Sequence, residues 1–140
     1  MLNEEVKVLR INMLKEHEKI DPKRFKELKE EITKDGFLKK PIVADKKTLV
    51  VLDGHHRLNV LRDLGLSRIP VVLIDYNNPN VIVKTWKGEG ELNKEDIINA
   101  ALSGNLFGPR TSKHMVVING ELHHIEIIQR EVNIPLEKLK

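Results

Sequence analysis

The sequence predicts an α/β fold with a mixed sheet, and two observations support this prediction. The 140 residues include 40% hydrophobic and 32% charged side chains, which suits one folded domain of ordinary size with a real core. Short apolar runs, typical of buried strands, recur along the chain between segments whose apolar residues repeat at helical spacing. We therefore expect residues 1–140 to form a single domain.

The first predicted elements are a strand and a helix. Residues 6–11 carry Val and Ile among polar neighbours, which indicates a strand, and a polar segment, 15–18, follows. Asp21 and Pro22 are typical of a helix start, with Asp as the N-cap and Pro in the first helical position. Gly36 is placed to end this helix. Its apolar face is formed by Phe25, Leu28 and Ile32.

The centre of the chain holds the stretch around which the other elements are arranged. Residues 48–52 form an apolar run that predicts a buried strand, and Asp53-Gly54 ends it. Three leucines at helical spacing then predict a helix that Gly65 stops. Apolar runs at 41–44 and 69–74 predict two further strands. The leucines that set the helical spacing are Leu58, Leu61 and Leu64.

The second half of the chain predicts a strand, a helix and a hairpin. Residues 81–86 alternate as in a strand, and 87–90 form a loop. Asn93 caps a helix whose inner face is expected to consist of Ile97, Ile98, Ala101 and Leu102. Residues 104–114 are expected to be an irregular basic loop. Asn119-Gly120 is a strong hairpin signal, and it should join strands over 115–118 and 122–128.

The composition excludes several classes of function. The chain has no cysteine, so thiol catalysis, disulfides and cysteine-ligated zinc are excluded. No apolar run reaches the length of a membrane span and no signal-peptide core is present, so we expect a soluble, cytoplasmic protein. The formal charge of +3 allows an anionic ligand but is weak support for a nucleic-acid groove. Abundant Lys, Glu and Ile hint at a thermophilic source, a hint that eleven Asn residues weaken.

The turn over residues 53–57 predicts an anion site. It delivers His55, His56 and Arg57 to the first turn of a helix, where free N–H groups and the helix dipole favour a phosphate. Gly54 would let the phosphate approach the backbone, and the three side chains add donors. A carboxylate beside an anion is repulsive unless a cation or a transferred proton lies between them. Asp53 therefore points to phosphate chemistry assisted by Mg²⁺.

The order of these elements resembles the ParB/sulfiredoxin-like domain from about Val6 to Tyr76. That domain has a helix ending in Asp-Gly-Phe/Leu, a strand beginning at Pro, a second strand, a Gly-x-His-Arg-type turn, a helix and an Ile-Pro-Val strand. The matching residues here are Asp35-Gly36-Phe37, Pro41, the run 48–52, Gly54-His55-His56-Arg57 and Ile69-Pro70-Val71. The resemblance implies a mixed-sheet α/β fold of this superfamily.

Members of this superfamily differ in the turn. Sulfiredoxins depend on a cysteine there, and this chain has His55 and no cysteine, so that activity is excluded. Chromosome-partitioning ParB proteins typically carry Gly-Glu-Arg-Arg, bind CTP and continue into a helix-turn-helix domain, which the residues after Tyr76 do not show. The Asp53–Arg57 form most closely resembles the free L-serine kinases, which use ADP or ATP with Mg²⁺. The resemblance implies conversion of free L-serine to O-phospho-L-serine, in serine and cysteine biosynthesis.

The same resemblance supplies candidate site residues. Phosphoryl transfer to a hydroxyl needs a phosphate cradle, a cation and a carboxylate to accept the hydroxyl proton. The turn with Gly54, His55, His56 and Arg57 is the expected cradle, and Asp53 is the expected ligand of Mg²⁺. The His17-Glu18 pair makes Glu18 the best candidate base, with Glu16 as the fallback. The expected substrate-binding residues are Trp86, Thr111, Ser112, Lys113 and His114.

Each of these sites has a structural alternative. Asp53 could be only an N-cap, Glu18 an exposed charge and Trp86 a core residue. The basic loop over 110–114 could be merely solvated. His123-His124 looks like a metal pair, but adjacent strand residues face opposite ways, so a structural role is favoured.

A rival function comes from another class. The chain could be a ParB-like, DNA-associated module that binds a nucleotide and changes conformation without transferring phosphate; the missing helix-turn-helix and the modest charge count against it. A nuclease would need more carboxylates around its metal than Asp53 and a distant Glu. The sequence leaves open whether the phosphoryl donor is ADP or ATP, and it leaves the oligomeric state open.

Overall fold

The computed structural model describes residues 2, 4–86 and 92–140, and it confirms the α/β class. The helices are α1 (Pro22–Asp35), α2 (His55–Asp63) and α3 (Lys94–Ser103), with short 3₁₀ helices η1 (Ile11–Met13), η2 (Ile125–Ile128) and η3 (Leu136–Leu139). The first strands are β1 (Glu5–Arg10), β2 (Phe37–Leu38), β3 (Ile42–Asp45), β4 (Val51–Asp53) and β5 (Arg68–Ile74). The later strands are β6 (Val81–Thr85), β7 (Ser112–Ile118), β8 (Glu121–His124) and β9 (Ile134–Pro135).

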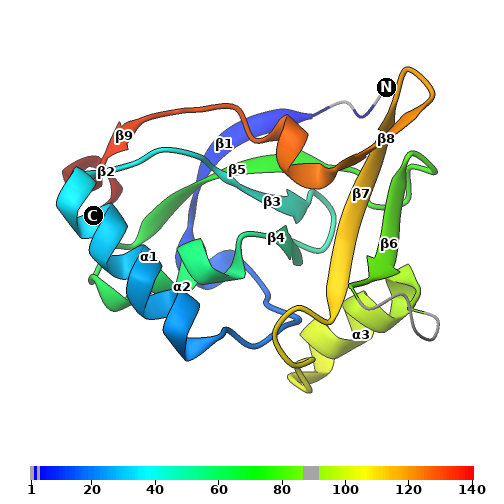
Figure 1. Cartoon of the computed structure of the whole chain (residues 1–140), viewed down its shortest axis with the longest axis horizontal. Helices are drawn as coiled ribbons and strands as arrows, with labels where there is room; N and C mark the ends of the chain where they lie inside the picture. The colour runs from blue at the N-terminus through cyan, green and yellow to red at the C-terminus, as the bar shows by residue number, and fades with distance from the viewer. Residues whose placement is uncertain (1, 3, 87–91) are drawn as a thin grey trace.

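The larger sheet is mixed, as predicted, with strand order β1-β5-β3-β4. β3 runs parallel to β5, and the other two pairs are antiparallel. Helices α1 and α2 lie side by side (Figure 1). Asp21 caps α1 as predicted, because its Oδ1 accepts the N–H of Lys23 at 3.1 Å. Buried side chains of both helices and of the sheet form a first hydrophobic core that includes Ile32, Ile42, Leu58, Leu61 and Val71.

A second sheet, β6-β7-β8, is antiparallel and packs with α3 (Figure 1). Alternate residues of β5 enter different cores, since Val71 belongs to the first and Val72 to the second. The larger sheet is therefore covered on both faces. Asn119 and Gly120 have φ angles of 52° and 79°, and they form the predicted turn between β7 and β8. The second core includes Val72, Val81, Ile97, Val116 and Ile125.

The last part of the chain returns to the first half as a C-terminal strap, residues 129–139. Strand β9 pairs with β2 in an antiparallel ladder. The N–H groups of Val132 and Asn133 donate to the carbonyl of Lys39 at 2.8 and 3.2 Å, and the N–H of Ser67 donates to Leu139 at 2.9 Å. These bonds bring the segment after η2 beside the loop between α1 and β3. Among the described residues, no helix has the length and apolar character needed to cross a membrane.

The strand predicted over 48–52 is shorter than expected. Strand β4 begins at Val51, and Leu49 has a φ of 61° in a tight turn. The turn is held by Asp45, whose Oδ2 accepts the N–H of Thr48 at 3.1 Å and its hydroxyl at 2.7 Å. A buried carboxylate that binds the backbone in this way favours a turn over continued pairing.

Three expectations for the second half were wrong. Leu102 is 58% exposed, and Ala100 takes the buried position instead. Residues 125–128 form η2 rather than a strand, because the His124 side chain accepts the N–H of Glu126 and caps a helical turn. Ser112, Lys113 and His114 lie in strand β7 and not in an irregular loop, since they pair with β6. The loop predicted over 87–90 lies outside the described residues.

Candidate active site

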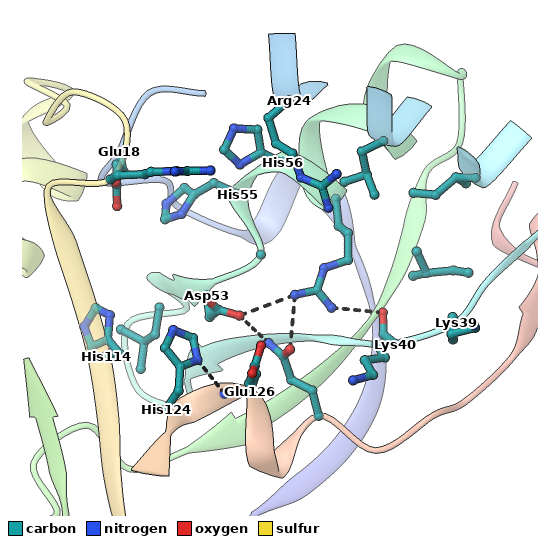
Figure 2. A pocket seen from close by; sticks show the side chains of 18 of the residues that line it. Glu18, Arg24, Lys39, Lys40, Asp53, His55, His56, His114, His124 and Glu126 are labelled. Carbon is teal, nitrogen blue, oxygen red and sulfur yellow. Dashed lines mark hydrogen bonds and ion pairs between the residues drawn. The ribbon is translucent and has the colours of Figure 1, made fainter. Parts of the chain in front are cut away.

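A pocket of about 380 Å³ gathers almost all of the predicted site residues. It is lined by residues of α1, α2, β4, β7 and the segments that join them (Figure 2). Glu18 and His114 lie toward one side of this view and Lys39 and Lys40 toward the other, with Asp53 between them. The predicted residues that line the pocket are Glu18, Asp53, Gly54, His55, His56, Arg57, Trp86, Ser112, Lys113 and His114.

The N-terminus of α2 opens into the pocket because Gly54 precedes it. Gly54 has a φ of 103°, and a Cβ added to it would lie 2.8 Å from Cβ of Ile42. Only glycine therefore fits this close approach between the turn and β3. The cap is Gly54 itself, without a side-chain hydrogen bond, so Asp53 is not the N-cap. The first N–H groups of α2 have no intrahelical acceptor and remain available to an anion.

His55 and His56 hold the segment that carries Glu18. Nε2 of His55 accepts the backbone N–H of His17 at 3.3 Å, and Nε2 of His56 accepts that of Asp21 at 2.9 Å. An imidazole that accepts through Nε2 is neutral and carries its proton on Nδ1. Burial lowers the pKa of both rings below 6.5, which keeps them in this form. The two rings thus link α2 to both sides of Glu18.

Arg57 orients Asp53 rather than projecting freely into the pocket. One of its terminal nitrogens donates to the carbonyl of Pro41 at 2.7 Å, and the other contacts Oδ2 of Asp53 at 3.3 Å and Oε1 of Gln129 at 3.1 Å. Nε2 of Gln129 donates to the same Oδ2 at 2.6 Å. Both neighbours bind Oδ2, and no hydrogen bond to Oδ1 of Asp53 is found among the described residues.

Glu18 is held at the pocket wall by the start of β7. Its Oε1 accepts the N–H of Thr111 at 2.8 Å, and its Oε2 accepts the hydroxyl of Ser112 at 3.0 Å. Its side chain is only 11% exposed, so it is not an ordinary surface charge. Thr111, predicted to bind substrate, instead donates its N–H to Glu18 and its hydroxyl to the carbonyl of Gly108.

Glu16, the fallback base, lies in a different environment. It contacts the side-chain amide of Asn59, and Arg62 lies 3.5 Å from its Oε2. It is not one of the residues that line the pocket. The geometry therefore favours Glu18 over Glu16 as the base.

Two further buried histidines lie at the pocket, His114 in its lining and His17 outside it. His17 is fully buried, and His114 is 2% exposed and bonded through Nε2 to the hydroxyl of Tyr76 at 2.8 Å. Burial lowers the pKa of His114 to about 3, so this ring is neutral. Nδ1 of His114 has no hydrogen-bond partner among the described residues, and it is closed to solvent. A buried polar atom of this kind does not contact a ligand in the pocket unless neighbouring side chains move.

Trp86 lies at the surface and not in a core. It is 48% exposed, and Nζ of Lys113 lies 5.1 Å from its ring centroid. The ring of His124 lies 6.0 Å from it. Trp86 therefore forms part of an aromatic and cationic wall of the pocket, as expected for a substrate-binding residue.

Sequence reasoning missed several residues that line the pocket. Gln129 lies 76 positions from Asp53 along the chain, and no local pattern links the two. Arg24 lies on α1, where it would be read as an ordinary exposed cation. Lys39 and Lys40 precede Pro41, and a lysine pair at such a position is more often plain surface than a phosphate contact. The lining residues with charged or polar side chains that were not predicted as site residues are Lys19, Arg24, Glu31, Asp35, Lys39, Lys40, Arg110, His124, Glu126 and Gln129.

His17, Glu18 and His55 lie close enough to hold a metal ion, but their ligand atoms are occupied. Both ring nitrogens of His17 and Nε2 of His55 make hydrogen bonds within the protein. Oδ1 of Asp53 is a better candidate for a cation. A carboxylate oxygen is the ligand type that Mg²⁺ prefers.

Comparison with known proteins places the chain in a family. A model of the ParB N-terminal domain matches residues 3–86. An ATP-dependent L-serine kinase from Staphylothermus marinus is 39% identical over 82 residues, which are 54% of this chain and 32% of that protein. A ParB-like protein from Sulfolobus acidocaldarius is 37% identical over 86 residues, 61% of this chain and 43% of that protein. This chain therefore spans less than half the length of the curated relatives it matches.

Solved structures confirm the fold over nearly the whole chain. A conserved hypothetical protein from Pyrococcus furiosus superposes with a TM-score of 0.83 at 17% identity, covering 97% of each chain. A free serine kinase in complex with AMP superposes with a TM-score of 0.82, also at 17% identity, covering 96% of this chain and 93% of that one. At this level of identity the likeness concerns the fold. The family match covers more than half of the sequence, and the chain belongs to the ParB N-terminal domain family.

Proposed function

We propose that this chain is a kinase that transfers a phosphoryl group from ADP or ATP to the hydroxyl of free L-serine. The observation that carries the proposal is the pairing, in one pocket, of a held carboxylate, Glu18, with the open N-terminus of α2 and Asp53. The printed names of the relatives from Staphylothermus marinus and Thermococcus kodakarensis, an ATP-dependent and an ADP-dependent L-serine kinase, support it.

Each part of the pocket has a role in this proposal. The free N–H groups of the first turn of α2 bind the donor phosphates, assisted by the cation Arg24. The apolar side chains of Leu28, Ile32 and Phe37 line the same pocket and offer a surface for the nucleotide base. The cation Lys113 receives the carboxylate of serine.

Asp53 is the residue that would hold Mg²⁺. Its Oδ1 is the oxygen that Arg57 and Gln129 leave unused, and the hydrogen bonds to Oδ2 fix the orientation of the carboxylate. When bound there, Mg²⁺ would neutralise negative charge on the phosphates. His123 is not part of this site: it pairs with Glu121 at 3.5 Å, as a structural role predicts.

Glu18 then acts as the general base. The serine oxygen forms a bond to the terminal phosphorus while the bond from that phosphorus to the nucleotide oxygen breaks, and the hydroxyl proton passes to the Glu18 carboxylate. His55 and His56 position Glu18 by binding the backbone on both sides of it. Their remaining Nδ1–H groups can still donate to a phosphate, as the sequence predicted.

The test is to incubate the purified protein with Mg²⁺, serine and either ATP or ADP, and to look for O-phosphoserine by mass spectrometry. We expect O-phosphoserine together with the nucleotide shortened by one phosphate, formed much more slowly by Glu18→Gln. Absence of the product with both nucleotides would overturn the proposal.

The second candidate is a ParB-like, DNA-associated module without kinase activity. The relative from Sulfolobus acidocaldarius, which is named ParB-like protein, favours this second candidate. This module would bind nucleotide without consuming it. A tight, sequence-selective shift of duplex DNA at physiological salt would favour this candidate, whereas weak binding that salt abolishes would not.

A further inference from the structure

A chain of hydrogen bonds leads from Glu18 away from the pocket and into the protein. The hydroxyl oxygen of Ser112 lies 3.0 Å from Oε2 of Glu18 and 2.9 Å from Nε2 of His17. On the other side of the ring, Nδ1 of His17 lies 2.7 Å from the carbonyl oxygen of Val51. His17 is fully buried, and Ser112 is 7% exposed.

The number of protons in this chain is constrained by its partners. A carbonyl oxygen only accepts, so Nδ1 of His17 must carry a proton. If His17 is neutral and Glu18 is ionised, the single hydroxyl proton of Ser112 has two acceptors to serve. Whichever way the hydroxyl turns, one of the two contacts then sets a lone pair against a lone pair.

One additional proton satisfies every contact. It can reside on Nε2 of His17, which then donates to Ser112 while Ser112 donates to an ionised Glu18. It can instead reside on Glu18, which then donates to Ser112 while Ser112 donates to a neutral His17. The two arrangements differ only in the positions of two protons along hydrogen bonds that already exist.

We propose that Glu18, Ser112 and His17 act as one proton-accepting unit, in which Ser112 relays to His17 the proton that Glu18 takes from the substrate hydroxyl. This inference rests on the proposed function and deepens it. Glu18 gives a proton to the Ser112 oxygen as Ser112 gives its own to Nε2 of His17. The unit gains one proton, and Glu18 returns to its ionised form beside the newly formed phosphate ester.

The groups that face His17 leave room for a positive charge on it. The ring of His55, from α2, lies 4.5 Å away, and the ring of His114, from β7, lies 5.8 Å away. Burial lowers the pKa of both, so they stay neutral and add no repelling charge. The carboxylate of Glu18, 3.6 Å from Nε2 of His17, would pair with the imidazolium.

The groups on the pocket side of Glu18 favour movement of the proton inward. Burial lowers the pKa of His56 most. The cations Arg24 and Arg110 lower it further, and the carboxylates Asp21 and Glu18 raise it, so all four charges lie near this ring. Among the residues that the structure describes, seven lysine and arginine side chains line the pocket, against four acidic ones besides Glu18. The cations are Lys19, Arg24, Lys39, Lys40, Arg57, Arg110 and Lys113, and the acids are Glu31, Asp35, Asp53 and Glu126. Net positive charge on this side stabilises an ionised Glu18. His17 and Ser112 are relay and positioning residues, because neither reaches the reacting atoms.

The test reads the protonation of His17 directly and needs no activity. In ¹⁵N-labelled protein, the two ring nitrogens of His17 are followed by NMR from pH 5 to 8, with the signals assigned by their loss in His17→Gln. We expect Nε2 of His17 to gain its proton at a lower pH in Glu18→Gln than in the unchanged protein. The difference should be at least about one pH unit, as for two strongly coupled sites. A Gln amide donates to Ser112 and satisfies the chain without an extra proton.

Glu16→Gln is the matched control, because this substitution removes a nearby negative charge that takes no part in the hydrogen bonds among Glu18, Ser112 and His17. Its His17 titration should follow that of the unchanged protein. Equal titration of His17 in both Gln variants would overturn the relay, whether or not the protein phosphorylates serine.

A kinetic readout separates relay from structure where the kinase is active. Single-turnover rates measured in mixtures of H₂O and D₂O should depend on D₂O content as expected for more than one moving proton. Ser112→Ala should slow turnover by roughly tenfold or more, and its D₂O dependence should be that of a single moving proton. Ser112→Thr keeps the hydroxyl and should restore both the rate and the dependence on more than one proton. A slow Ser112→Ala with the full dependence would show that Ser112 only positions Glu18.

Discussion

Glu18 shows how position gives a single side chain an environment that its sequence context does not predict. An exposed Glu beside Lys19 would be the ordinary interpretation of its sequence context. The structure surrounds it instead with the N–H of Thr111 and the hydroxyl of Ser112, on the wall of a pocket. Glu16, two residues away, has the same side chain, yet its oxygens contact Asn59 and Arg62 and it does not line the pocket.

Replacing Glu18 by Gln should therefore lower kcat by roughly 10²- to 10⁴-fold, the range for a positioned general base. Nucleotide affinity should change little, since the proposed phosphate site is at α2 and not at Glu18. Steady-state kinetics with calorimetric titration of nucleotide measures both quantities. Glu16→Gln is the control and should keep near-normal turnover. A dead Glu16→Gln beside an active Glu18→Gln would reverse the assignment.

Replacing Gly54 should destabilise the fold. In Gly54→Ala the new Cβ would meet Ile42 at a φ of 103°, so both strain and overpacking oppose it. We expect a loss of about 2–5 kcal/mol in the free energy of unfolding. Gly104→Ala is the matched control: its φ of 78° is also positive but nothing lies within 4 Å of the new Cβ, so about 1–2 kcal/mol is expected. Denaturant unfolding would measure both, and equal losses would show that the contact with Ile42 is unimportant.

At the scale of elements, α2 serves as a support for a loop as well as an anion site. Its first two side chains accept backbone N–H groups on both sides of Glu18, so the helix and the segment 17–21 are joined. This joining is possible only while the imidazoles are neutral. It makes the position of the base sensitive to acid.

Acid should loosen this junction. In the folded protein, burial lowers the pKa of His56 below its ordinary value of 6.5. At a pH between the folded and the unfolded pKa, the unfolded chain therefore binds a proton more readily than the folded one. The stability that this ring contributes is therefore complete above about pH 6.5 and is lost as the pH falls. The thermal midpoint should drop between pH 7 and 5, and by less in His56→Gln, which accepts without titrating. Parallel curves for the two proteins would contradict this role.

The elements also show what the sequence could predict. Local signals identified α1 by Asp21 and Gly36, and the hairpin by Asn119-Gly120, because caps and turns are properties of neighbouring residues. The Glu18 site came from a family resemblance, whereas the turn after the central strand already indicated Asp53. Gln129 and Arg24 could not be found in this way, because their roles depend on which distant segments pack together. Ser112–His114 were placed in a loop, since short strands with few apolar residues leave a weak pattern.

At the scale of the whole molecule, the pocket lies where several parts of the chain meet, so a ligand should stabilise all of them. ADP or ATP at about 100 times its Kd should add about 2.7 kcal/mol to the free energy of unfolding. For a chain of this length that corresponds to a rise of roughly 10 °C in Tm. Differential scanning fluorimetry with and without Mg²⁺ would measure it. Glu18→Gln should shift as far, whereas duplex DNA in place of nucleotide should give no comparable rise.

The C-terminal strap affects the order in which the molecule can become complete. Gln129, which orients Asp53, and β9, which pairs with β2, are made after the elements that they contact. The residues that match the family model end at 86, so they leave the ribosome before the strap does. Until the strap follows, Asp53 lacks its 2.6 Å hydrogen bond, and the edge of β2 lacks its partner. A nascent chain would thus order the carboxylate of Asp53 only after Gln129 has been made.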